Sequence, residues 1–274
     1  MLKLYKYGNS ICTQKVFVLL DTKKIDYEPI NVDLFKNEQY NPAYLKLNPK
    51  GVVPTLIHDG NVVVESTLIC EYIDEVYPNP SFTPESPSQK SRMRLWSKMV
   101  DEALFAATRE ISFSAMFREK LKNMTAEQRE TRFKNVGDPD RRARNVSCFE
   151  YGVESPYVLQ GIAAFEKAFK TMEADLASEG PWLLGRDISL ADINLMPFVA
   201  RLAYVNLLEV WLEERPHVAD WWRRVEEYPS FKSQIRMHVT DTEMAEMQTS
   251  GAKIMPRVSA RRQEYLNDFK IITK

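Results

Sequence analysis

Residues 47–72, with the sequence LNPKGVVPTLIHDGNVVVESTLICEY, constrain the fold of this chain more than any other stretch. The stretch opens with a Pro-x-Gly loop signal, because proline fixes φ and glycine permits positive φ. Two short β-branched runs, at 55–57 and 62–64, flank Asp59-Gly60, and Asp-Gly in that position predicts a hairpin. Apolar residues at helical spacing follow and predict an amphipathic helix that begins at Glu65-Ser66.

This stretch also contains a candidate binding site. A proline at the head of a strand, as in Val53-Pro54, is a natural place for a cis peptide bond. Val53 would then offer its own N–H and C=O to a ligand. Glu65 and Ser66 lie where a helix N-terminus offers free N–H groups to an anion. A ligand bound at both places needs an extended backbone and a carboxylate, which describes a small peptide. The alternative is an ordinary hairpin and helix without a ligand.

The composition is that of an ordinary globular protein. The chain has 274 residues, enough for two domains, of which 27% are charged and 44% hydrophobic. Its net charge of -1 gives no reason to expect nucleic acid or an anionic membrane as a partner. No run of eighteen apolar residues occurs, so we expect neither a membrane span nor a signal peptide.

The three cysteines are too few and too scattered for a disulfide framework or a metal site. They are Cys12, Cys70 and Cys148. We therefore expect no metal and a reducing, cytoplasmic setting.

The first 77 residues predict a thioredoxin-like α/β half. Residues 2–6 alternate as a strand, 12–23 are helical and 28–32 form a second strand, before the hairpin and helix described above. We expect the first two strands to be parallel, through a right-handed crossover. The absence of a Cys-x-x-Cys pair argues against a thiol-disulfide oxidoreductase.

A proline-rich segment at 78–87 predicts a stiff linker and a domain boundary. We therefore expect a thioredoxin-like domain over 1–77 and an all-helical domain over 88–274. The second domain should contain one long or bent helix over 91–117, a loop at 135–140 and a helix over 156–176. Its RRAR run at 141–144 is either an anion-binding patch or a solvated helix face.

Residues 188–193 predict the buried start of a further helix. Ser189 is an N-cap residue, and Asp192 completes an acidic version of the capping box. Ile188 and Ile193 lie where a hydrophobic staple requires apolar residues. These residues have a structural role and no chemical one.

Two of these patterns together carry a family resemblance. N-P-x-G-x-V-P, D-G and E-S, followed much later by S-x-A-D, resemble the glutathione transferase family. The resemblance implies that family's fold, with an α/β thioredoxin-like domain and an all-α domain, and implies glutathione as cofactor. It also implies that Val53 and Pro54 pair with the cysteinyl backbone of glutathione. Glu65 and Ser66 would hold its γ-glutamyl carboxylate.

The same resemblance places the chemistry at Asn9-Ser10. The run Ser-x-Cys-x-x-Lys-Val from Ser10 is similar to the Ser-Ser-Cys-x-x-Arg-Val segment of zeta-class enzymes, in which the first serine donates a hydrogen bond to the glutathione sulfur. A free thiol has a pKa of about 8.5. A hydroxyl donor and a helix N-terminus both favour the thiolate. Asn9 would support Ser10 through its side-chain amide.

Two rivals to Ser10 stay open. Tyr7 also lies near the strand end, and other classes use a tyrosine as the donor; otherwise it packs on the core. Cys12 would form a mixed disulfide with glutathione in omega-like classes, although these have Cys-Pro where Thr13 follows here. Otherwise Cys12 is a small, half-buried helix residue.

Two charged residues have weaker expected roles. Lys50 would meet the glycine carboxylate of glutathione, or is an exposed loop lysine. In related dimers, an acid on the helix that carries Asp101 reaches the γ-glutamyl ammonium of the other subunit. Asp101 is otherwise a plain surface residue, and the resemblance implies a homodimer.

An aromatic and methionine surface is expected to bind the second substrate, facing Ser10. An apolar surface of this kind suits a planar aromatic molecule, although several of its members would also suit a core. The candidate lining residues are Trp96, Phe105, Phe113, Met116 and Phe117.

Within the family, the chain resembles bacterial glutathione-dependent β-aryl etherases of lignin breakdown. The segments that carry this are DGNVVVESTLICEYIDEVYP at 59–78, RMRLW at 92–96, RRARN at 141–145 and Asn9-Ser10. The thiolate would then attack the carbon that bears the aryl ether, and an aryloxide would leave. The residues after Ser10 and the long tail after Met237 depart from that pattern. The alternatives are a zeta-like isomerase, a general detoxifying conjugator, or a non-catalytic binding module.

Overall fold

The computed structural model describes residues 1–34 and 36–272, and the chain forms two compact units that alternate along the sequence. Unit 1 comprises Met1–Ser97, Ser178–Pro197 and Asp220–Thr240; unit 2 comprises Lys98–Ala177, Phe198–Ala219 and the residues from Asp241 onward. The predicted boundary at residues 78–87 stays a prediction.

Unit 1 contains the sheet. Its elements are β1 (Leu2–Lys6), α1 (Ile11–Thr22), β2 (Glu28–Asn31), η1 (Glu38–Tyr40), α2 (Pro42–Leu45), β3 (Thr55–His58), β4 (Asn61–Val64), α3 (Ser66–Val76), most of α4 (Pro87–Met99), the first half of α10 (Leu190–Tyr204), most of α12 (Pro216–Glu227), α13 (Pro229–Gln234) and η5 (Arg236–His238).

Unit 2 is helical. Its elements are the π-helical segments η2 (Val100–Leu104) and η3 (Phe113–Phe117), α5 (Phe105–Ser112), α6 (Arg118–Lys122), α7 (Ala126–Lys134), α8 (Pro139–Tyr151), η4 (Gly152–Glu154), most of α9 (Pro156–Glu179), α11 (Glu209–Leu212), α14 (Asp241–Ile272) and the remaining parts of α10 and α12.

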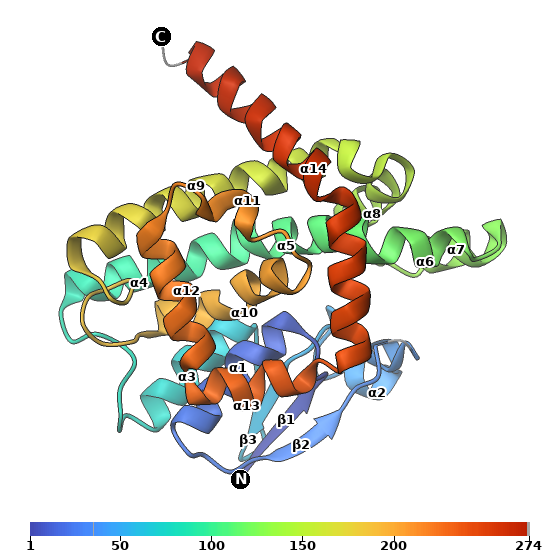
Figure 1. Ribbon diagram of the computed structural model, residues 1–274. Coiled ribbons are helices and arrows are strands. Elements are labelled where there is room, and N and C mark those ends of the chain that lie inside the picture. The colour runs from blue at the N-terminus through green and yellow to red at the C-terminus, as the bar shows by residue number, and fades with distance from the viewer. Residues whose placement is uncertain (35, 273–274) are drawn as a thin grey trace. The chain divides into compact units, whose positions relative to one another are not determined.

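The sheet has the strand order β2-β1-β3-β4, and Figure 1 shows it beside α1 and α13. β1 and β2 are parallel, as predicted, and the other neighbours are antiparallel. The hairpin turn is also confirmed. Asp59 and Gly60 have φ of 49° and 85°, the two positive values that a tight type I′ turn requires.

Helix α1 is the centre of unit 1, and it packs against both α3 and α13. Its apolar residues from Val16 to Leu20 are buried. Helix α3 buries Ile69 and Ile73, but Leu68 and Val76 are exposed, contrary to the predicted single apolar face. The reason is geometric, because only the side of α3 that faces α1 and the sheet is covered in unit 1.

The proline-rich segment is tied to unit 1 by a buried ion pair. Lys23 Nζ lies 2.7 Å from Asp74 Oδ1, and both side chains are shielded from solvent. Lys23 also donates to the carbonyl oxygens of Tyr77 and Pro80, while the Asp74 carboxylate accepts from the Phe82 N–H at 3.0 Å. The segment is therefore held by polar contacts as well as by the stiffness of its prolines.

The predicted cap of α10 is present. Asp192 Oδ2 accepts from the Ser189 N–H at 3.0 Å and from its hydroxyl at 2.9 Å. Asp192 Oδ1 accepts from the Leu183 N–H and from the Trp221 indole. Burial raises the pKa of this carboxyl, and the four hydrogen bonds oppose that rise. The structure thus gives this pattern the structural role that was expected of it.

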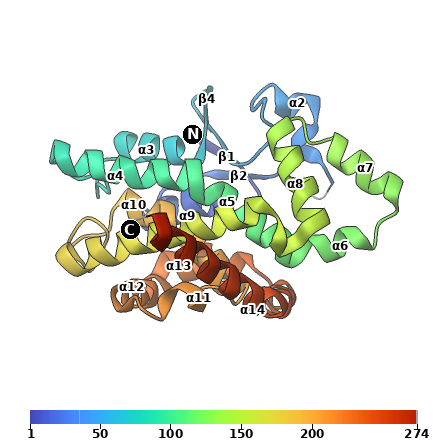
Figure 2. The same cartoon turned by 90° about the horizontal axis from the view of Figure 1, so that it is seen from above.

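Unit 2 confirms the long or bent helix predicted over 91–117. The chain stays helical through this range, and η2 and η3 are the π segments where such helices bend. Figure 2 shows α6, α7 and α8 folded back beside one another after it. The tail after Met237 is mostly the long helix α14, and its Arg262 Nε lies 2.6 Å from Glu166 Oε2 of α9. Within the described residues, no helix is long and apolar enough to cross a membrane.

Candidate functional site

The strand register brings three predicted site segments to one end of the sheet. Tyr5 near the end of β1 pairs with Thr55 at the start of β3, and Thr55 pairs with Val64 at the end of β4. The residues that follow β1, precede β3 and follow β4 therefore lie at the same sheet end. These are the Tyr7–Ser10 loop, Val53-Pro54 and Glu65-Ser66. The structure thus gathers most of the residues that the sequence singles out for glutathione.

Ser10 is the N-cap of α1. Its Oγ accepts a hydrogen bond from the Thr13 N–H at 3.4 Å, and its own N–H donates to the Tyr7 carbonyl at 3.0 Å. A hydroxyl that accepts from the backbone keeps its proton available for donation to an anion. The first turn of α1 adds free N–H groups and the positive end of the helix dipole at the same point. Asn9 directly precedes this cap and is half-buried.

Tyr7 and Val53 lie in one apolar cluster. Val53 is buried together with Val32 and Tyr44, and Tyr7 packs against them. Tyr7 thus has the packing role that the sequence offered as its alternative, and the structure does not exclude it as a donor. The same cluster joins the Ser10 loop to the start of β3.

The segment before β3 is held by side-chain hydrogen bonds. Tyr44 Oη and Asn48 Nδ2 both donate to the Val52 carbonyl, at 2.6 and 2.9 Å. The Val53-Pro54 peptide bond is cis, as predicted. Strand pairing begins only at Thr55, and within the described part of the chain no partner is recorded for the backbone groups of Val53. They can therefore pair with an extended ligand.

Glu65 and Ser66 occupy the start of α3. Glu65 takes the N-cap position at φ 71°, and its side chain caps no N–H of this helix. Instead Glu65 Oε1 lies 2.7 Å from Lys50 Nζ, so two predicted ligand residues are paired across the site. Ser66 is buried in the first turn. A carboxylate bound here would meet the helix N-terminus and the Ser66 hydroxyl.

Two residues beside these segments were missed by the sequence reasoning. Lys15 of α1 is fully buried and donates to Thr67 Oγ1 of α3 at 2.7 Å, joining the starts of the two helices. His238 stacks on Phe17 with ring centroids 4.8 Å apart, and a Cβ on Gly8 would lie 2.9 Å from its Nδ1. The Lys-Val pair after Ser10 was a local signal for Lys15. His238 is more than 200 residues from Gly8 in sequence and had none.

The cysteines differ in their suitability as nucleophiles. Cys12 is half-buried in the first turn of α1, two residues after Ser10, so the mixed-disulfide alternative stays open. Burial raises the pKa of the Cys148 thiol to about 11, which makes it a poor nucleophile at neutral pH.

The remaining predicted residues are divided between the two units. Trp96 is buried in unit 1, whereas Asp101 is exposed in unit 2. In unit 2, Phe105 is 37% exposed, and the rings of Phe113 and Phe117 are 6.2 Å apart. Met116 is half-buried next to them in sequence. Their role as a substrate pocket facing Ser10 stays a prediction.

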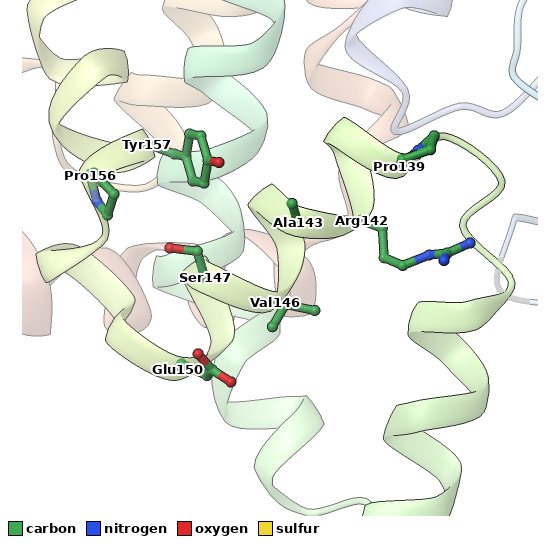
Figure 3. A pocket seen from close by; sticks show the side chains of 8 residues that line it. All are labelled: Pro139, Arg142, Ala143, Val146, Ser147, Glu150, Pro156 and Tyr157. Atoms are coloured by element: carbon green, nitrogen blue, oxygen red, sulfur yellow. The ribbon is translucent and has the colours of Figure 1, made fainter.

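An open groove of about 530 Å³ lies in unit 2 between α8 and the start of α9. Figure 3 shows Arg142, Ser147 and Glu150 along one wall and Tyr157 near the other. None of the predicted site residues lines it. Its mixture of charges and its openness give it no resemblance to the enclosed apolar pocket expected for an aromatic substrate.

Comparison with protein families identifies the chain. The glutathione S-transferase N-terminal domain matches residues 1–75, and the C-terminal domain of the same family matches residues 139–224. Protein LigF from Sphingobium sp. (strain NBRC 103272 / SYK-6) is 31% identical over 84% of this chain and 91% of its own length. The chain belongs to the glutathione S-transferase family. This is a family of enzymes that use glutathione, so the predicted fold and cofactor are confirmed.

Other relatives set the range of chemistry in this family. The crystal structure of β-etherase LigF superposes with a TM-score of 0.75 at 28% identity, over 86% of this chain and 99% of that one. Glutathione S-transferase Z2 of Arabidopsis thaliana is 27% identical over 88% of this chain and 93% of its own length. Tetrachloro-p-hydroquinone reductive dehalogenase of Sphingobium chlorophenolicum is 26% identical, over 84% and 94%.

Proposed function

We propose that this protein is a glutathione-dependent transferase in which Ser10 stabilises the glutathione thiolate for attack on an aromatic substrate. The observation that carries the proposal is the position of the Ser10 hydroxyl. It caps α1 at the sheet end where the Val53 backbone and the start of α3 also lie.

The glutathione would be bound along its whole length. The unpaired backbone of Val53, before Pro54, would pair with the cysteinyl unit, and Glu65 and Ser66 would hold the γ-glutamyl end. Lys50, paired with Glu65 at 2.7 Å, is placed to contribute a positive charge to the same anion-binding region. Asn9 would orient the Ser10 loop.

The sharpest form of the proposal is cleavage of a β-aryl ether. In that reaction the thiolate sulfur forms a bond to the carbon that bears the ether, and the carbon–oxygen bond breaks. The electron pair leaves with the aryloxide, which takes a proton from solvent. The similarity to LigF, whose crystal structure is described as that of a β-etherase, supports this choice.

The substrate ring would contact the aromatic and methionine side chains of the first long helical region. Trp96, Phe105, Phe113, Met116 and Phe117 are the proposed contacts. We further propose a homodimer in a cytoplasmic setting, in which Asp101 reaches the glutathione of the other subunit.

A second function from the same site is a zeta-like isomerase or a general conjugating enzyme. The similarity to transferase Z2 and to a reductive dehalogenase favours it, because these relatives cover as much of the chain as LigF does. A binding module without catalysis is the remaining alternative.

Calorimetric titration with glutathione, followed by incubation with a β-aryl ether that releases a fluorescent phenol, tests the proposal. Binding together with glutathione-dependent phenol release is the expected result. Binding without release would reject the etherase and leave the conjugating enzyme or isomerase. Absence of glutathione binding would reject the transferase itself.

A further inference from the structure

The RRAR run at 141–144 is not the solvated helix face that the sequence allowed as one alternative. Arg142 donates to the carbonyl oxygens of Val136 and Lys134, at 2.8 and 3.2 Å, and so caps the end of α7. Arg144 lies 2.9 Å from Glu110 Oε1 and 2.7 Å from Asp140 Oδ2. Both guanidinium groups therefore have structural partners.

Arg141 is different. It lies one turn before Arg144, so the two side chains share the face of α8 that packs against α5. Across the described chain, no carboxylate lies within ion-pair distance of the Arg141 guanidinium. The nearby charge that it affects is another cation, Arg109 of α5.

Arg109 is held at close range to like charges. Its Nη2 lies 3.5 Å from Glu110 Oε1, the oxygen that Arg144 already binds at 2.9 Å. Its Nε is buried and makes no hydrogen bond within the described residues. Burial lowers the pKa of Arg109, the Arg141 and Arg144 guanidinium groups lower it further, and Glu110 opposes them.

The cluster therefore carries an excess of positive charge. Three guanidinium groups share two carboxylates, and the more buried of these, Glu110, is only 2% exposed. Holding like charges together in a half-buried place is unfavourable unless an anion joins them. The planar fork of an arginine matches a carboxylate, which two such groups would bind firmly.

An aromatic surface lies beside the cluster. The guanidinium carbon of Arg109 lies 5.8 Å from the ring centroid of Phe105, one turn earlier on the same helix, and this ring is partly open to solvent. A ligand that used both features would combine a flat ring with a carboxylate.

We propose that Arg109 and Arg141 bind the carboxylate of an aromatic substrate, with Phe105 contacting its ring. This inference rests on the proposed function, because it names the class of aromatic substrate that the transferase accepts. The anion site itself lies wholly within unit 2 and involves neither Ser10 nor glutathione.

The direct test is calorimetric titration of the full-length protein, without glutathione, with benzoate and with the neutral isostere benzamide. Benzoate should bind at least about tenfold more tightly, as expected for charge-assisted hydrogen bonds. Arg141→Met and Arg109→Met should remove this preference. Arg132→Met, an exposed arginine on neighbouring α7, should leave it unchanged. Equal binding of the two ligands, or a preference that survives in both cluster variants, would overturn the proposal.

A second measurement separates this inference from the proposed function. Two β-aryl ethers that differ only by a carboxylate or a carboxamide on the aryl ring are compared in the presence of glutathione. The ratio of their kcat/KM values should fall about tenfold in Arg141→Met, with kcat/KM for the carboxamide unchanged. An unchanged ratio contradicts the anion site. If neither ether is cleaved, the etherase fails, and the benzoate titration still decides the anion site.

Discussion

Ser10 illustrates how one small side chain serves both folding and chemistry. Its oxygen accepts from the backbone at the start of α1, while its proton stays available for an incoming thiolate. Alanine would remove both interactions, and a larger residue would displace the cap. The local sequence was enough to select Ser10, because N-cap chemistry depends only on neighbouring residues.

His238 makes stability depend on pH. Burial lowers its pKa below the ordinary value of 6.5, and the positive charge of Lys6 adds to the effect. The unfolded chain therefore binds this proton more readily than the folded protein does. The stabilising contribution is complete above pH 6.5 and is lost as the pH falls through the lowered folded value. His238→Gln should reduce the loss of unfolding free energy between pH 7.5 and 5.

Urea unfolding at several pH values measures this difference. The comparison is between the slopes of the two proteins, since other groups titrate equally in both. Parallel slopes over this range would show that His238 titrates alike in the folded and unfolded chain.

At the level of elements, short-range patterns were reliable. Asp59-Gly60 and the runs around it specified the hairpin, and the proline and glycine before Val53 specified the loop. Ser189 and Asp192 specified the start of α10. Each of these depends on residues a few positions apart, which is the range over which turn and cap chemistry operates.

Long-range packing could not be predicted in this way. Nothing local indicates that Leu68 of an apolar helix face is exposed, that Lys23 holds a segment near residue 80, or that Arg141 faces Arg109. These outcomes depend on which elements meet in space. A periodic pattern shows that a face is apolar, but it does not show what covers it.

Helix α14 offers a sharp test of element packing. A Cβ on Gly251 would lie 1.6 Å from the Val205 carbonyl oxygen, so α14 touches the end of α10 with no room for a side chain. Gly251→Ala should lower the unfolding free energy by roughly 3 kcal/mol, because backbone would have to move against backbone.

Gly137→Ala is the matched control, since a Cβ there meets nothing within 4 Å. It should leave stability unchanged or raise it by about 0.5 kcal/mol. Equal effects of the two substitutions in thermal or urea unfolding would show that α14 does not pack closely on α10.

At the scale of the whole molecule, the two units alternate along the chain. Stretches from three parts of the sequence build unit 1, so a boundary drawn from composition at residues 78–87 does not describe its packing. The two family matches, at 1–75 and 139–224, show that the two sequence segments are each typical of the family.

The proposed homodimer has a candidate surface on unit 1. Leu68 of α3 and Leu95 of α4 are 56% and 61% exposed, and the two helices are joined by the Arg94–Glu71 ion pair at 3.2 Å. Exposed apolar side chains grouped in this way mark an interaction surface. Leu68→Glu combined with Leu95→Glu should convert the dimer to a monomer in sedimentation velocity.

Met237→Glu provides the control, because Met237 is 77% exposed on unit 1 but lies on η5. It should sediment as the wild-type protein does. A double variant that remains dimeric would place the interface elsewhere, and a wild-type monomer would reject the homodimer.

The most direct test of the account is the pKa of the glutathione thiol in the bound state, followed by thiolate absorbance during a pH titration. The account predicts a value about 1.5 units or more below the ~8.5 of a free thiol in the wild-type protein. Ser10→Ala should return the thiol pKa toward the free value with little change in glutathione affinity, while Tyr7→Phe leaves it low. The same thiol pKa in wild type and Ser10→Ala, or a rise caused by Tyr7→Phe instead, would contradict the assignment of Ser10.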